Sequence, residues 1–176
     1  MDKIIPAIVV VGYQRAKSLN RILHSISNAV FEDMNIPLII SIDYSDCNND
    51  VIDIANSFKW KYGQKTVRTF DANQGLRNHI IQCGDISIIY GGVIILEDDL
   101  FVSPYFYKYA IEAMNYYKDD ERIAGIALYS YQVNNFAQRE FIPLKSEYDI
   151  FFSKMAVTWG QCWTKNQWTN FKEWYF

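Results

Sequence analysis

The stretch Val93-Ile94-Ile95-Leu96-Glu97-Asp98-Asp99 places four apolar residues directly before three consecutive carboxylates. The apolar part is short, rich in β-branched residues and preceded by Gly91-Gly92, which predicts a strand that is buried on both faces. The carboxylates repel one another, and no basic residue is adjacent to them in the sequence. A divalent cation such as Mg²⁺ or Mn²⁺ would relieve this repulsion. A solvated acidic turn is the alternative, but the position directly after a buried strand favours a metal site.

Similar apolar runs recur along the chain and alternate with segments of helical spacing. Strands are predicted at Ala7–Val11, Leu38–Asp43, Thr66–Phe70, Val93–Leu96 and Ile123–Leu128. The predicted helices are Ala16–Ala29, the segment from Val51 to Phe58, the stretch after Gly75, a turn that Asp85 can cap, and the segment from Ser103 to Lys118. This alternation predicts an α/β, Rossmann-like fold with a mostly parallel central sheet and helices on both faces.

Polar clusters follow three of these strands, at the edge where such sheets bind ligands. Arg15 follows the first strand and precedes a helix, so its guanidinium and the helix N–H groups would suit a pyrophosphate; a surface arginine is the alternative. Asp43 ends the second strand and could accept the N3–H of uracil, although a turn-forming aspartate is equally compatible with the sequence. Arg77 and His79 are weaker candidates, because a single histidine is more often structural.

The composition excludes several classes of protein. The chain has 176 residues, 50% of them hydrophobic, which suits one domain with a sizeable core. A net charge of −3 without a basic stripe argues against nucleic-acid binding. The apolar runs are far shorter than the roughly 20 residues of a transmembrane helix, and the 3 cysteines lack zinc spacing. We expect a cytoplasmic protein, with peripheral contact to the inner face of a membrane and oligomerisation left open.

Aromatic residues are abundant, with 13 Tyr, 11 Phe and 5 Trp. Core packing accounts for such residues in most proteins, and composition alone favours that reading. Aromatic rings also stack against the apolar face of a pyranose, so sugar binding is the second interpretation. After Leu128 the periodic pattern weakens into a Tyr-rich loop, which a Trp-rich segment follows.

Together these motifs resemble the GT-A glycosyltransferases, particularly bacterial family 2-like sugar transferases and the N-acetylglucosaminyltransferase I family. The resemblance covers almost the whole chain, and the strand followed by Glu-Asp-Asp is its most specific part. The matching stretches are Ala7–Arg15, Ile39–Asp43, Asn73–His79, Val93–Leu100 and Thr158–Trp163.

The resemblance implies a metal-dependent transfer of sugar from a UDP-sugar to an acceptor hydroxyl, with inversion preferred. Asp99 would be the ligand of Mn²⁺ or Mg²⁺, Asp98 would face the ribose and Glu97 the donor sugar. Asp43 would bind uracil and Arg15 the diphosphate. The acceptor would be a glycan or glycolipid, as in surface polysaccharide or lipopolysaccharide biosynthesis.

The resemblance also implies roles for the remaining candidates and a division of the chain. His79, or Arg77 beside it, would lie near the nucleotide, and Trp159-Gly160 would shape the sugar pocket. Residues 1–128 would form the donor-binding half and residues 129–176 the start of a truncated acceptor-side region. The catalytic base of inverting members follows the Trp-rich stretch, so we expect it beyond Phe176.

Two other functions remain open at this point. A nucleotidyltransferase that makes nucleotide sugars shares the strand order, but it would need a longer Gly-rich loop with Lys or Arg after the first strand than Gly12–Arg15 provides. A non-enzymatic carbohydrate-binding module would use the aromatic residues and would need neither metal nor nucleotide. Dependence on a nucleotide separates the module from an enzyme.

Overall fold

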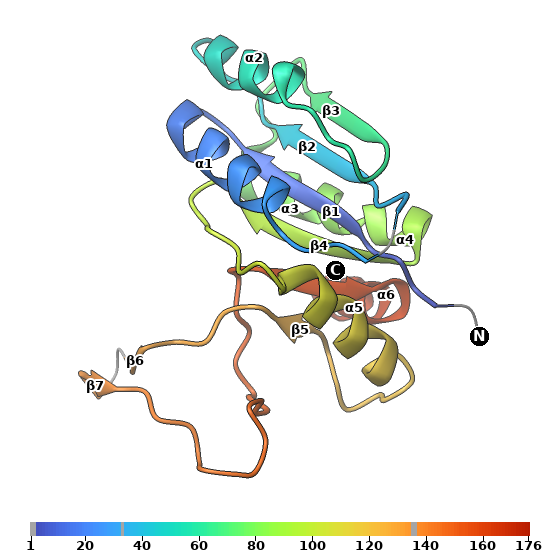
Figure 1. Cartoon of the computed structure of the whole chain (residues 1–176), viewed down its shortest axis with the longest axis vertical. Helices are drawn as coiled ribbons and strands as arrows, with labels where there is room; N and C mark the ends of the chain where they lie inside the picture. Colours follow the sequence, from blue (N-terminus) through green and yellow to red (C-terminus); the bar gives the residue numbers. More distant parts are fainter. Residues whose placement is uncertain (1–2, 33, 135–136) are drawn as a thin grey trace.

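The computed structural model describes residues 3–32, 34–134 and 137–176, and a six-stranded sheet is its central element (Figure 1). The strands follow the order β3-β2-β1-β4-β8-β5. The first four strands of that order are parallel, whereas β8 is antiparallel to both of its neighbours. Their bounds are β1 Ala7–Gly12, β2 Leu38–Ile42, β3 Lys65–Thr69, β4 Gly92–Glu97, β5 Ile126–Ala127 and β8 Gln161–Thr164. The predicted α/β class with a mostly parallel sheet is confirmed.

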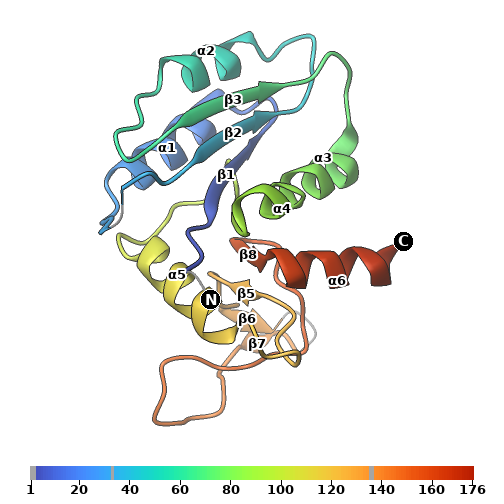
Figure 2. The same cartoon turned by 90° about the vertical axis from the view of Figure 1, so that its right-hand side faces the viewer.

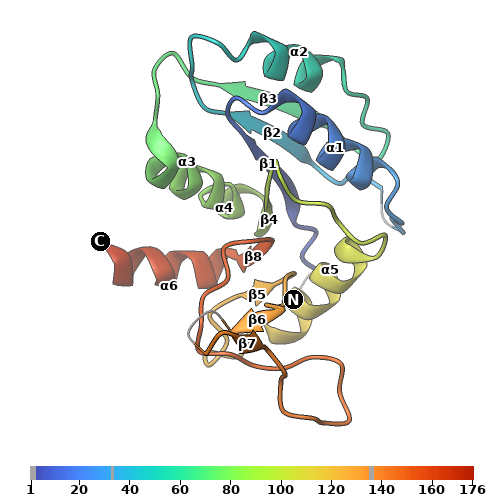
Figure 3. The ribbon, with the colours of Figure 1, turned by 90° about the vertical axis from the view of Figure 1, so that its left-hand side faces the viewer.

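Helices cover both faces of the sheet (Figures 2 and 3). One face carries α1 (Ala16–Ser27), α2 (Asn49–Ser57) and α5 (Phe106–Tyr117). The other carries α3 (Gly75–Gly84), α4 (Ile86–Tyr90) and α6 (Lys165–Tyr175). Because β1 is sandwiched between these layers, Ile8 and Val10 pack into one core while Ala7 and Val9 pack into the other. This two-sided burial explains why the strand is a continuous apolar run.

The order of the strands beyond β4 differs from the expected arrangement. The strand predicted at Ile123–Leu128 is present as the shorter Ile126–Ala127, and it pairs with β8 instead of β4. Strand β8, from the Trp-rich segment, lies between it and β4, with Cys162 opposite both Ile94 and Ile126. The fifth strand is therefore present and runs in the same direction as β4, but the antiparallel β8, which was not predicted, takes the position beside β4.

A long excursion separates β5 from β8 (Figure 1). It carries a small hairpin of β6 (Val133–Asn134) and β7 (Arg139–Glu140), and the described residues 141–160 then return as a loop. Among the described residues, no helix has both the length and the apolar character needed to cross a membrane.

Candidate functional site

The loops that follow the parallel strands meet at one edge of the sheet, where side-chain hydrogen bonds connect them. Gln14 Nε2, after β1, donates to Ser45 Oγ at 2.6 Å. Asn73 Nδ2, after β3, donates to the Tyr44 carbonyl at 2.9 Å. Since ligands of such sheets bind at the carboxyl ends of the strands, this edge is the candidate site.

Arg15 joins the end of β1 to the carboxylates that follow β4. Its Nη2 and Nε donate to Asp98, and its Nη1 donates to Asp99 Oδ2 at 3.0 Å. The Asp98 side chain is 3% exposed, whereas that of Asp99 is 41% exposed. Burial raises the pKa of Asp98, while its hydrogen bond to Arg15 and the positive charge of Arg15 oppose the rise. Arg15 therefore lies at this edge, as predicted, and forms ion pairs there with Asp98 and Asp99.

A second arginine, which the sequence did not single out, also reaches this group. Arg21 Nη2, from α1, donates to the backbone carbonyl of Asp99 at 2.6 Å. No local pattern indicates this contact, because the two residues are 78 positions apart and meet only through the adjacency of β1 and β4. Two arginines that are distant in sequence, Arg15 and Arg21, thus offset the repulsion among the carboxylates.

Glu97 points to a different environment from its two neighbours. It lines a cavity of about 1330 Å³ whose walls also include Thr158, Trp159, Gln161 and Trp163. Burial raises the pKa of Glu97, and the charges of Asp99 and Asp98 raise it further. The end of β4 therefore presents one carboxylate to the cavity and two to arginine.

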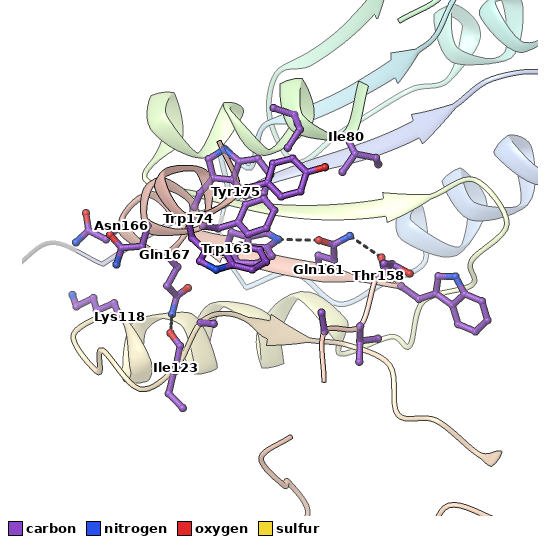
Figure 4. A pocket seen from close by; sticks show the side chains of 18 of the residues that line it. Ile80, Lys118, Ile123, Thr158, Gln161, Trp163, Asn166, Gln167, Trp174 and Tyr175 are labelled. Atoms are coloured by element: carbon purple, nitrogen blue, oxygen red, sulfur yellow. Dashed lines mark hydrogen bonds between the residues drawn. The ribbon is translucent and has the colours of Figure 1, made fainter. Parts of the chain in front are cut away.

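Aromatic side chains from β8 and α6 form much of the cavity wall (Figure 4). Trp163, Trp174 and Tyr175 lie together there, and Trp163 Nε1 donates to Gln161 Oε1 at 3.1 Å. Gln161 Nε2 donates in turn to the Thr158 carbonyl at 3.0 Å. Stacking surfaces with a few fixed polar groups are typical of sites for small organic ligands.

Trp159 and Gly160 lead into β8 beside this cavity. The exposed Trp159 ring lies 4.8 Å from the ring of Tyr129, and Trp159 contributes to the cavity wall. Gly160 has a φ of 70°, and a Cβ there would come within 2.9 Å of Leu128 Cβ. A glycine is therefore required to turn the chain into the strand.

Asp43 is buried, and both of its carboxylate oxygens accept hydrogen bonds from backbone N–H groups. Its Oδ1 accepts from the N–H groups of Tyr44 and Gln74, each at 2.8 Å, and its Oδ2 accepts from Gly75 N at 3.1 Å. These bonds hold the turn before α3 against the end of β2. Asp43 also borders a cavity of about 330 Å³ that Phe70 helps to line. Contact with a nucleobase stays a prediction, whereas the turn-stabilising role is visible.

The two candidates on α3 occupy different surroundings. His79 is 2% exposed, its Nε2 lies 2.6 Å from Ser41 Oγ, and burial lowers its pKa to about 4. A ring that is buried this deeply is not accessible for direct contact with a ligand. Arg77 instead lies on the wall of the larger cavity, with its guanidinium 4.9 Å from the ring centre of Tyr175.

The donor set limits which metal could bind. Among the described residues, no three His, Cys, Asp or Glu side chains are grouped to hold an ion. Asp98 is committed to Arg15 and Glu97 faces the cavity, so Asp99 is the exposed carboxylate of the three. One carboxylate fits Mg²⁺ or Mn²⁺, which complete their shells with phosphate and water, but not a cage built from protein alone.

Comparisons with known proteins give only a distant structural likeness. The sequence matches no family model and no curated protein. The crystal structure of S. aureus TarS 1-349 in complex with UDP shares 12% identity and a TM-score of 0.49, over 64% of this chain and 33% of that chain. The complex of S. aureus TarS 1-349 with UDP-GlcNAc gives 14%, 0.48, 64% and 32% in the same order. This chain thus spans about a third of those structures, and its fold class rests on its own strand order.

Proposed function

We propose that this chain is the nucleotide-sugar-binding part of a GT-A glycosyltransferase that transfers sugar from a UDP-sugar to the hydroxyl of a glycan or glycolipid. One observation carries this proposal. The end of β4 divides its carboxylates between the arginine group at Asp98 and Asp99 and the aromatic cavity at Glu97. Groups suited to a phosphate–cation pair thus adjoin a surface suited to a pyranose.

Each part of the site has a role in this proposal. Arg15 binds the diphosphate through its planar fork of donors. Asp99 holds Mn²⁺ or Mg²⁺, which supplies charge neutralisation for a departing nucleoside diphosphate. Glu97 accepts hydrogen bonds from sugar hydroxyls, while Trp159 stacks on the ring.

The remaining features of the proposal concern the nucleobase of the donor and the course of the reaction. Asp43, at the border of the smaller cavity, distinguishes uracil from cytosine, which lacks the N3–H donor. The reaction is an in-line attack with inversion, assisted by a base that takes the acceptor proton. Biosynthesis of a surface polysaccharide or lipopolysaccharide is the proposed setting.

A thermal-shift panel tests the proposal. UDP, CDP, ADP, UDP-sugars and free glycans are each added with and without Mn²⁺. UDP with Mn²⁺ should stabilise the chain by about 2.7 kcal/mol at a hundredfold excess over Kd. Asp99→Asn should remove the Mn²⁺-dependent part, whereas Asp53→Asn, at an exposed carboxylate on α2, should retain it.

The same panel can contradict the proposal in two ways. Stabilisation by free glycans, with no effect of any nucleotide, would identify a carbohydrate-binding module. Equal stabilisation by UDP in wild type and Asp99→Asn, with Mn²⁺ present, would remove Asp99 from the metal site.

A further inference from the structure

We infer that Arg15 is an exchange residue, which holds Asp99 until the donor binds and then moves one nitrogen from Asp99 to the diphosphate. Asp98 keeps the rest of the guanidinium in place, and the released Asp99 takes the cation. This inference rests on the proposed function, and it adds an internal competitor to the metal site.

The unequal surroundings of the two ion pairs identify the bond that can exchange. Asp98 is buried and receives both Nη2 and Nε of Arg15. Asp99 is exposed and receives only Nη1, at 3.0 Å. Breaking a buried pair leaves an uncompensated charge in the interior, whereas an exposed pair contributes little to stability. The bond to Asp99 is therefore the weaker one, while Asp98 acts as the anchor.

Exchange follows from the charges at Asp99. A divalent cation on this carboxylate would lie beside the positively charged Nη1, so the metal and Arg15 compete for the same oxygens. A phosphate oxygen is a strong acceptor for the displaced nitrogen and also a ligand for the cation. Cation and diphosphate should consequently bind with positive coupling, and each should bind weakly alone.

Arg21 provides a matched control. It is also positively charged and also contacts Asp99, but it donates to the backbone carbonyl and leaves the carboxylate unchanged. Removing Arg21 changes the local charge without freeing the carboxylate oxygens of Asp99. An effect specific to exchange should therefore appear on removing Arg15 and not on removing Arg21.

The experiment measures Mn²⁺ affinity of the full chain by the electron paramagnetic resonance of free Mn²⁺, without nucleotide and then with UDP. Without nucleotide, Arg15→Met should bind Mn²⁺ about tenfold more tightly than wild type, because the substitution removes both the exposed ion pair that competes for Asp99 and the positive charge beside the cation. Arg21→Met should change this affinity by less than about threefold, the share expected from a screened charge alone. The factor by which UDP tightens Mn²⁺ binding should fall at least about tenfold in Arg15→Met, because both halves of the exchange are lost.

Arg15→Lys keeps the folded chain testable if Arg15→Met unfolds. A lysine retains the charge opposite Asp98 but lacks the fork that bridges two carboxylates, so it should also bind Mn²⁺ alone more tightly than wild type. Arg15 variants that bind Mn²⁺ no more tightly than Arg21→Met would overturn the exchange, even if wild type binds Mn²⁺ and UDP as proposed. Tighter Mn²⁺ binding by the Arg15 variants, with no UDP binding by wild type, would support the competition and overturn the proposed function.

Discussion

His79 is the residue whose protonation the fold most clearly opposes. Burial lowers its pKa from 6.5 to about 4, so the unfolded chain binds more protons between these values. The stability associated with neutral His79 is therefore complete above pH 6.5 and is lost as the pH falls towards 4. We expect the free energy of unfolding to drop by about 2 kcal/mol between pH 7 and pH 5. Urea unfolding at the two pH values measures the change.

Two variants isolate this effect. His79→Gln should flatten the pH dependence over that window, whatever its own cost in stability. His24→Gln, at the exposed second histidine, should keep the wild-type slope. Identical slopes in wild type and His79→Gln would assign the pH dependence to other groups.

Substitution of Asp43 should change both the stability of the fold and the preference for uracil over other nucleobases. In Asp43→Asn an amide group replaces one of the oxygens that accept from the backbone of Tyr44, Gln74 and Gly75. The loss of an acceptor in a buried position should cost about 1–3 kcal/mol in unfolding experiments. Asp46→Asn, at an exposed residue of the same loop, should cost less than about 0.5 kcal/mol.

The same variant tests recognition of uracil. Calorimetry should show that wild type prefers UDP to CDP and ADP, and that Asp43→Asn loses part of this preference. An unchanged preference in Asp43→Asn would limit Asp43 to holding the turn before α3.

At the scale of single residues, the sequence predicts positions better than partners. The carboxylates of Glu97–Asp99 were expected at a strand end, and they lie there. Their separation into two environments was not predictable, because Arg15 is 83 positions from Asp98 and meets it only through the pairing of β1 with β4. His79 shows the same limit, since its burial depends on the contact of α3 with Ser41.

Among the elements, the packing of α6 depends on a glycine in α3. A Cβ at Gly84 would come within 2.0 Å of the Trp168 ring, so Gly84→Ala should force α6 away from the sheet. The expected cost is about 1–3 kcal/mol, the usual range for overpacking. Urea unfolding measures the cost, and a change in tryptophan fluorescence of the folded protein reports the movement of Trp168.

Ser87→Ala, in the neighbouring helix α4, should have the opposite effect. The Ser87 hydroxyl is buried and has no hydrogen-bond partner among the residues that the structure describes. Removing an unsatisfied polar atom should leave stability unchanged or raise it by about 1 kcal/mol. A loss above about 1 kcal/mol would show that the hydroxyl has a partner, such as a bound water.

The elements also show why part of the sheet escaped prediction. Strand β1 and residues 93–96 of β4 are continuous apolar runs, and β2 is interrupted only by the buried Ser41. Two-sided burial makes such runs conspicuous in the sequence. Strand β8 has only four residues, and its burial alternates in the sequence Gln-Cys-Trp-Thr, which is too short for a clear period. Asp85 lies at the N-cap of α4 as predicted, but its side chain makes no cap hydrogen bond and instead accepts from Trp168 and Lys172 of α6, which are distant in sequence.

Across the whole molecule, the sheet edge and the aromatic cavity come from distant parts of the chain. The edge is built from β1, β2 and β4 in the first hundred residues, whereas most of the cavity wall comes from the segment after α5 (Figures 1 and 4). The end of β4 touches both. The proposed binding of nucleotide and of sugar should therefore be separable by mutation.

Glu97→Gln is the substitution that tests this separation. Glu97 lines the cavity, while Asp98 and Asp99 bond to Arg15, so the proposed sugar contact can be weakened without disturbing the diphosphate contacts. Calorimetry with Mn²⁺ should show UDP-sugar affinity falling about tenfold, the order expected for a lost hydrogen bond to a charged group, with UDP affinity nearly unchanged. Asp99→Asn should weaken both ligands, because both share the diphosphate. Equal losses for UDP and UDP-sugar in Glu97→Gln would mean that Glu97 acts through the carboxylate group as a whole, and the cavity would no longer be the sugar site.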